Sequence, residues 1–220
     1  MRRLDSIDPW QLADSAFPTG GFAHSWGLEA AWQAGELDAE SLPDVLRQLL
    51  WQTGHGTLPL VTTAYRSPDR LEALDARAQA FLTNPVANRA SRVQGRAFLT
   101  TCSRIWPSDA LVELEGRARA LGGHYGPLSG ATLAALDVPL PTAQRLILYQ
   151  TCRGALAAAV RLGIVGSYLA QRLQHDCVDE LDSVLAACES LGETDLAQTA
   201  PLLDLMQAGH DRLYSRLFQS

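Results

Sequence analysis

Lysine is missing from this chain of 220 residues, and all 18 of its basic residues are arginine. Arginine forks pair well with carboxylates and suit protein interfaces, so the bias fits a partner-binding role. A GC-rich genome explains the same bias more simply. Acidic residues outnumber the arginines and give a formal net charge of −6. This balance argues against nucleic acid as a partner, because non-specific nucleic-acid binding needs a basic surface.

Long apolar runs are missing too. The most apolar stretch, residues 146–171, is interrupted by Arg153 and Arg161, which is not typical of a membrane span. Residues 1–8 contain two arginines but no apolar segment of the kind found in secretory signals. We therefore expect a cytoplasmic protein with no membrane partner.

Compact catalytic and metal-binding motifs are also absent. The four cysteines have no CxxC spacing and lie among apolar helical neighbours, which is typical of buried free thiols. The five histidines form no HExxH pair, and no P-loop or GxGxxG occurs. We predict no catalytic, cofactor-binding or metal-ligating residue, and hence no enzyme. A metal-dependent enzyme built from the scattered histidines is one alternative, and a small-molecule-binding regulator with a deep apolar pocket is another.

Helix signals dominate, and the alternation typical of strands is nearly absent. Asp8-Pro9 and Asn84-Pro85 each place an N-cap residue before a proline, and residues 41–44 resemble a capping box. The last helix is expected to begin near Pro201 and to keep one apolar stripe as far as Leu217. These signals predict an all-α fold, a compact bundle of about ten helices that forms a single domain over residues 1–220.

Charge is distributed unevenly along the chain. Residues 138–175 contain four arginines and no acid, whereas residues 176–204 contain eight acids and no arginine. These segments either pair with each other inside the fold or face a partner of opposite charge. Arg89, Arg92 and Arg96 share one helix face, which fits a solvated face or a carboxylate-binding one.

The two ends of the chain are its most unusual parts. Residues 11–31 combine a helix end, a sharp turn rich in proline and glycine, and a new helix. Residues 210–220 keep aromatic and aliphatic side chains almost to the last residue, with arginines between them. Such a tail needs a docking surface on its own core or on a partner, and we favour a partner.

Three long motifs resemble the UreF family of urease accessory proteins. They are LADSAFPTGGFAHSWGLE at residues 12–29, NPVANRASRVQGR at residues 84–96, and APLLDLMQAGHDRLYSRLFQS at residues 200–220. The likeness runs nearly the whole chain in the expected order. One departure is the segment GPLSG at residues 126–130, where a bulkier sequence is expected.

The resemblance implies a homodimer that joins a UreD-type (also called UreH) accessory protein and the nickel-carrying GTPase UreG. That assembly meets the urease apoprotein and supports GTP-dependent delivery of nickel to its active site. The expected function is therefore a scaffold for maturation of the nickel metallocentre, with no cofactor of its own. The alternative within the same pathway is a regulator of the GTPase, which would require an arginine finger such as Arg216 or one of Arg89, Arg92 and Arg96.

Family roles are transferred only to matching residues. Residues 215–218 match the tail that orders on the UreD-type partner, and Arg216 matches an arginine implicated in recruiting the GTPase. Phe22 lies where the family has an aromatic residue near the same surface, and Glu29 matches a glutamate of the opening motif. The predicted partner-binding residues are Phe22, His24, Glu29, Arg212, Tyr214, Arg216, Leu217 and Phe218.

Overall fold

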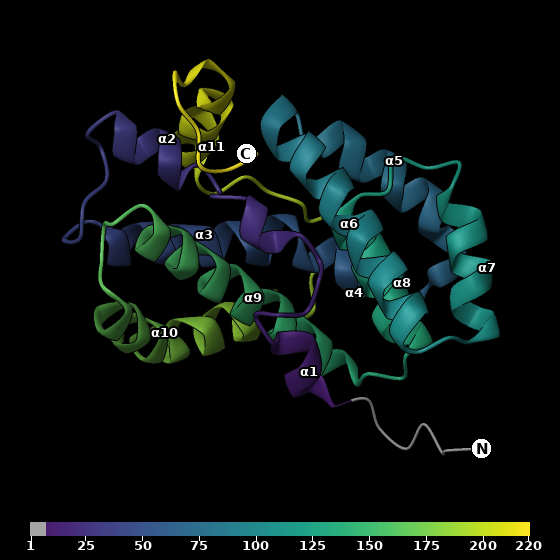
Figure 1. Cartoon of the computed structure of the whole chain (residues 1–220). Coiled ribbons are helices and arrows are strands. Elements are labelled where there is room, and N and C mark those ends of the chain that lie inside the picture. Colours follow the sequence, from purple (N-terminus) through teal and green to yellow (C-terminus); the bar gives the residue numbers. More distant parts are fainter. Residues whose placement is uncertain (1–7) are drawn as a thin grey trace.

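The computed structural model describes residues 8–220, except for the side chain of Phe22. Residues 1–7 lie outside the described part. The expectation that residues 1–8 form no secretory signal therefore falls mostly on residues that the structure does not describe. The described chain is all-α, with eleven α-helices and three 3-10 segments (Figure 1). This confirms the predicted class and the expectation of about ten helices. The bounds are α1 Pro9–Ala13, η1 Gly21–Ala23, α2 Leu28–Gln33, α3 Leu42–Gly56, α4 Leu58–Arg66, η2 Pro68–Arg70, α5 Leu71–Phe81, α6 Pro85–Ile105, α7 Asp109–Ala118, α8 Tyr125–Ala135, α9 Leu140–Arg161, α10 Ser167–Cys188, α11 Pro201–Ala208 and η3 His210–Arg212.

Helix α8 is the central element of one half of the molecule, where it packs against α4, α5, α6 and α7. Eight consecutive residues from Gly126 to Leu133 are buried. The approach to α4 is close, because a Cβ added at Gly130 would lie 2.3 Å from the carbonyl oxygen of Val61. The GPLSG segment is therefore part of a buried helix rather than an exposed loop.

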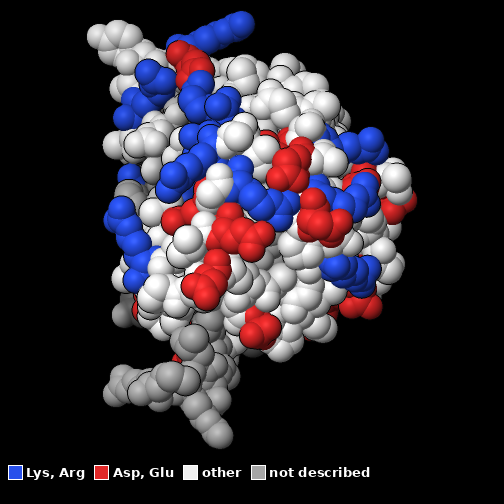
Figure 2. All heavy atoms as spheres, turned by 90° about the vertical axis from the view of Figure 1, so that its right-hand side faces the viewer, with Lys and Arg blue, Asp and Glu red and all other residues white. Residues whose placement is uncertain are grey.

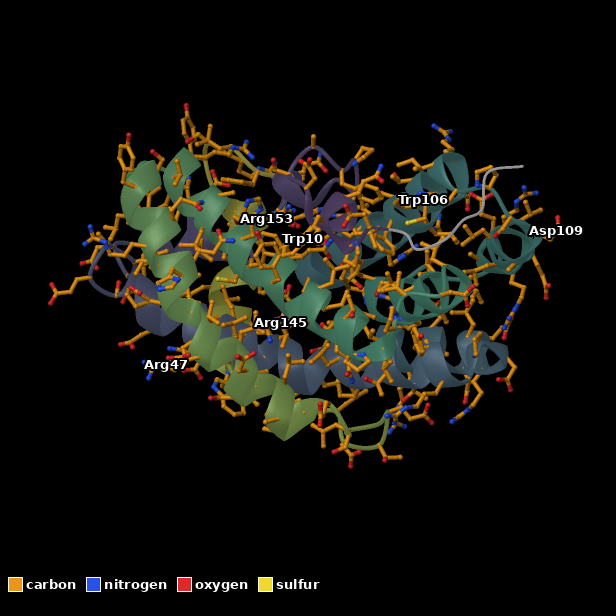
Figure 3. The ribbon with its side chains drawn as sticks, turned by 90° about the horizontal axis from the view of Figure 1, so that it is seen from below. Trp10, Arg47, Trp106, Asp109, Arg145 and Arg153 are labelled. Atoms are coloured by element: carbon orange, nitrogen blue, oxygen red, sulfur yellow. The ribbon has the colours of Figure 1, made fainter. Side chains whose placement is uncertain are left out.

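The other half contains α3, α9 and α10, which pack against one another. The segregated charges partly pair here, since Arg145 of α9 forms an ion pair with Asp182 of α10. Helix α1 packs on α9, and Arg153 of α9 donates a hydrogen bond to the carbonyl oxygen of Ala13 (Figure 3). Pairing within the fold thus accounts for part of the uneven charge distribution.

All three helices begin where the sequence signals place them, but only two of the three have the predicted side-chain cap. The side chains of Asp8 and Asn84 accept hydrogen bonds from the first turns of α1 and α6. The prediction of a capping box at residues 41–44 is wrong, because the side chain of Ser41 accepts no hydrogen bond from the first turn of α3. Its hydroxyl instead donates to Asp38, which also accepts from the backbone N–H groups of Glu40 and Ser41.

The predicted length of the last helix is also wrong. Helix α11 ends at Ala208, a 3-10 turn follows, and residues 213–220 are irregular. We call residues 213–220 the tail. It turns back onto α2 and the segment before it instead of extending into solvent, so the yellow end of the chain lies beside α2 in Figure 1.

The surface over α5, α6 and α7 carries positive and negative side chains in close alternation (Figure 2). One link is the ion pair between Arg117 of α7 and Glu72 of α5, at 3.0 Å.

Among residues 8–220 no helix is both long and apolar enough to cross a membrane. The thiols of Cys102, Cys152 and Cys188 are buried and that of Cys177 is half-buried, in line with free cysteines in the core.

Candidate functional site: the corner formed by the opening motif and the tail

The opening motif forms a tight turn that leads into α2. Three of its residues, Gly20, Trp26 and Gly27, have positive φ angles. At Gly27 a Cβ would lie 3.3 Å from the carbonyl oxygen of Leu203. The close packing of α11 therefore also requires a residue without a side chain at this position. The turn therefore brings the start of α2 directly under α11 and the tail that follows it.

The end of the tail pairs with the backbone of this turn. The N–H of Ser25 donates to the carbonyl oxygen of Ser220 at 2.6 Å, and the N–H of Gln219 donates to that of Ala23 at 2.8 Å. The hydroxyl of Ser25 donates a further hydrogen bond to the same carbonyl oxygen of Ser220, at 3.0 Å. A hydrogen bond of 2.5 Å also joins His24 Nδ1 and Ser220 Oγ.

Glu29 lies beneath the tail and is fully buried. Its carboxylate accepts hydrogen bonds from the N–H of Leu217 at 2.6 Å and the N–H of Phe218 at 3.2 Å. His210 Nε2 donates a third bond at 3.0 Å, and this histidine is also fully buried. All three donors belong to η3 or the tail, so the C-terminal region supplies these donors to the carboxylate.

Phe218 fixes the apolar side of the tail. Its ring is buried, and the guanidinium carbon of Arg161 lies 4.2 Å from the ring centroid, in the range of a cation–π contact. Arg161 also donates to the carbonyl oxygen of Leu217, at 3.3 Å. Arg161 of α9 thereby adds a further attachment for the tail, besides those to Glu29 and the opening turn.

The outer face of the corner presents large apolar side chains to solvent. Tyr214 is fully exposed and Leu217 is 60% exposed. On the adjoining helices Leu202 and Leu205 of α11 and Trp32 of α2 are exposed as well. Large apolar side chains gathered on neighbouring elements are typical of protein interaction sites.

The arginines predicted to share a face of α6 are all used within the chain. Arg89 makes a two-pronged contact with the Asp211 carboxylate, at 2.8 and 3.2 Å, while Arg92 and Arg96 donate to the carbonyl oxygens of Gly122 and Leu121. Carboxylate binding is thus confirmed for Arg89, with a partner in the same chain. The Arg89 hydrogen bond, helped by its charge and that of Arg216, holds the pKa of Asp211 below its usual range.

The predicted partner-binding residues fall into two groups. Exposed side chains belong to Arg212, Tyr214, Arg216 and Leu217. Buried side chains belong to His24, Glu29 and Phe218, whereas that of Phe22 lies outside the described structure. Sequence reasoning did not single out Ser25, His210, Asp211 and Ser220, although they lie in the first and third motifs, because each acquires its role from a contact with a distant part of the chain.

His24 occupies an electrostatically unfavourable place for a cation. Burial, together with the charge of Arg89 and the proximity of His210, lowers its pKa from 6.5 to about 4. Its imidazole is therefore neutral near pH 7, and its Nε2 atom has no hydrogen-bond partner.

A cavity beside His24 has a volume of about 270 Å³. Its walls are mixed, with Gln52, Thr53 and Asp204 beside apolar residues. Within residues 8–220 no three His, Cys, Asp or Glu side chains are grouped as metal ligands.

The chain is similar to known proteins over nearly its whole length. The UreF family model matches residues 37–178. Urease accessory protein F of Arabidopsis thaliana is 37% identical over 219 residues, which cover 96% of this chain and 91% of that protein. The protein of the same name from Oryza sativa subsp. indica is 36% identical over 216 residues, covering 95% and 83%. Urease accessory protein UreF of Trichodesmium erythraeum (strain IMS101) is 30% identical over 219 residues, covering 94% of each chain.

These likenesses, together with the all-helical fold, define an accessory protein of the urease system. The chain belongs to the UreF family, as the three sequence motifs predict. Membership of this family implies a role in urease maturation.

Proposed function

We propose that this protein is a non-enzymatic, cytoplasmic scaffold that joins a UreD-type accessory protein and recruits the UreG GTPase to the urease apoprotein. In this assembly nickel is the cargo, and the scaffold acts as a homodimer. Family membership supports the pathway. The observation that carries the scaffold role is the corner itself, where buried contacts hold an ordered tail whose Tyr214 and Leu217 face solvent.

A held tail is a better binding element than a free one. A tail already fixed at Glu29 and Ser25 loses less conformational entropy when a partner binds. Aromatic side chains are frequent hot spots because one ring buries a large area with few rotatable bonds. Tyr214 and Leu217 therefore form the proposed contact with the UreD-type protein.

Regulation of the GTPase is the second candidate, and the position of Arg216 favours it. Its guanidinium is exposed and lies 3.3 Å from Asp211, which already binds Arg89. An exposed ion pair of this kind contributes little and is readily exchanged for another carboxylate or a phosphate. Arg216 is thus available to a GTPase that docks beside the tail.

The test uses the paired change Tyr214→Ala and Leu217→Ala. Urease activation is measured in a mixture of apo-urease, UreD-type protein, UreG, nickel, bicarbonate and GTP. We expect the altered chain to fold normally, since both side chains are exposed, but to lose most of its binding to the UreD-type protein and its support of activation. The matched control is Val112→Ala, an exposed aliphatic side chain on α7.

Two outcomes contradict the proposal. Activation that is the same without the chain removes the accessory role. Activation that needs the chain but tolerates both tail substitutions leaves the accessory role and removes the tail from it.

A further inference from the structure

Glu29 is buried too deeply to meet a partner while the tail is in place. Both carboxylate oxygens face inward contacts, Oε1 with the N–H of Leu217 and Oε2 with the N–H of Phe218 and with His210. An isolated carboxylate is expensive to bury, and donors such as these are what make its burial tolerable. Removing the tail from its place would strip two of the three donors from this carboxylate.

The same contacts fix the register of the tail. The two N–H groups belong to consecutive residues and meet two different oxygens of one side chain, so a slip by one residue would break the pattern. In the observed register the side chain of Phe218 is buried and that of Leu217 is exposed. Exchanging these two positions would bury Leu217 and expose the aromatic ring.

A second set of contacts holds the far end of the tail. Ala23 and Ser25 pair with Gln219 and Ser220 through the backbone. Nearer α11, residues 213–216 bridge the distance between η3 and Glu29, and the amide of Gln33 on α2 donates to the carbonyl oxygen of Ser215 at 3.0 Å. Tyr214 lies within this bridge, with its side chain in solvent.

We infer that Glu29 and His210 form a latch that positions the tail in one register, and that Glu29 acts on the UreD-type partner through the tail without touching it. This inference rests on the proposed function, because the exposed Tyr214 and Leu217 are its proposed contacts. The inference assigns Glu29 of the opening motif a positioning role, which is compatible with its complete burial.

The direct test is Glu29→Gln, which keeps the shape of the side chain but replaces one acceptor oxygen by an NH₂ donor. That donor would face an N–H group of the tail or of His210. We expect amide hydrogen exchange at Leu217 and Phe218 to become at least about tenfold faster, because a hydrogen bond to a buried charge is among the stronger ones. Affinity for the UreD-type protein is expected to fall by about tenfold as well.

The matched control is Glu36→Gln, an exposed glutamate just beyond the same helix. It should change neither exchange at the tail nor affinity. A second variant, Gln219→Pro, removes the N–H that bonds to Ala23 without altering the buried carboxylate. It loosens the tail even if Glu29→Gln proves too unstable to purify, and it should produce the same two effects.

A direct contact between Glu29 and the partner is distinguished by combining substitutions. On a background that carries both Tyr214→Ala and Leu217→Ala, Glu29→Gln should cost little further affinity if it acts only by positioning these two contacts. A full additional tenfold loss would overturn the inference, as would unchanged exchange at Leu217 and Phe218 or faster exchange with unchanged affinity. If the unaltered chain does not bind the UreD-type protein, the proposed function fails, whereas exchange in the isolated chain still judges the latch.

Discussion

At the scale of single residues, the corner depends on buried polar groups that are hydrogen-bonded to the tail. His24 and Glu29 lie on one short stretch of chain, and both are almost inaccessible to water. His24 bonds to Ser220 in its neutral form, whereas Glu29 collects three donors as a buried acceptor. Protonation of His24 in the acidic range should therefore disfavour the folded state.

We predict that the free energy of unfolding decreases as the pH falls from about 6.5 towards about 4. In the folded state the pKa of His24 is lowered, so above pH 6.5 the imidazole is neutral in both states and contributes no pH dependence. Below that pH the unfolded chain takes up the proton first. The loss from this group is at most about 3 kcal/mol, at 1.36 kcal/mol per unit of pKa shift. Denaturant unfolding at several pH values measures it.

The variant His24→Asn isolates this contribution, because asparagine keeps a hydrogen-bonding group near Ser220 but does not titrate. Its unfolding free energy should vary less between pH 6.5 and pH 4 than that of the unaltered chain. Some variation should remain, since burial also lowers the pKa of His124. An identical slope in both proteins would show that His24 is not the group responsible.

Which of these residues the sequence could identify follows from the kind of contact each makes. The exposed tail side chains Tyr214 and Arg216 were identifiable, because an aromatic and basic tail is an unusual composition. The bond between Glu29 and His210 was not, because it joins residues 181 positions apart and nothing local indicates it. A partner-binding role for His24 and Glu29 stays a prediction. Because both side chains are buried against the tail, they would act on a partner through the tail.

At the scale of helices, close approach rather than apolar periodicity explains the packing of α8. Gly126 and Gly130 lie one turn apart and face α4, where Leu60 and Val61 come near enough to leave no space for a side chain. Periodicity could not reveal this, since a helix buried on all sides has no distinct apolar stripe. The caps at Asp8 and Asn84, by contrast, depend only on neighbouring residues and were predicted correctly.

The last helix shows the opposite case, in which a local pattern misled. An apolar stripe continues past Ala208 towards Leu217, and helical periodicity alone extends the helix accordingly. Contacts with Glu29 and with the turn before α2 instead hold residues 217–220 in an irregular path. Tertiary hydrogen bonds thus outweigh the weak intrinsic preference for helix at the end of the chain.

We predict that Gly130→Ala destabilises the protein by about 3 kcal/mol, the upper part of the usual range for overpacking a core. Its Cβ would lie 2.3 Å from the carbonyl oxygen of Val61, a backbone atom that cannot rotate away. The matched control is Gly116→Ala on α7, where no atom lies within 4 Å. There the better helix propensity of alanine should stabilise the protein by about 1 kcal/mol. Equal unfolding midpoints for the two variants would contradict the close packing of α4 and α8.

At the scale of the whole molecule, residues 20–33 and residues 200–220 meet at one corner, although most of the helical body lies between them in sequence. The family model covers residues 37–178, which contain α3 to α9 and much of α10, whereas most of the corner is built from residues outside that range, with Arg89 of α6 and Arg161 of α9 adding contacts from within it. The body therefore serves as the support on which the corner is assembled. That residues 1–220 form a single domain, and that two copies form a homodimer, stay predictions.

Substitution of Arg216 tests whether this corner binds two partners through different residues. We predict that Arg216→Ala keeps its affinity for the UreD-type protein but weakens recruitment of UreG, because the apolar contacts of Tyr214 and Leu217 stay in place while an exposed guanidinium is lost. The exposed ion pair with Asp211 contributes at most about 1 kcal/mol, so the fold should tolerate the change. Pull-down of UreG by the preformed complex of this chain with the UreD-type protein measures the effect. The control is Arg104→Ala, on α6. If Arg216→Ala recruits UreG with full affinity, the GTPase binds elsewhere on the molecule, and if it loses the UreD-type protein instead, one surface serves a single partner.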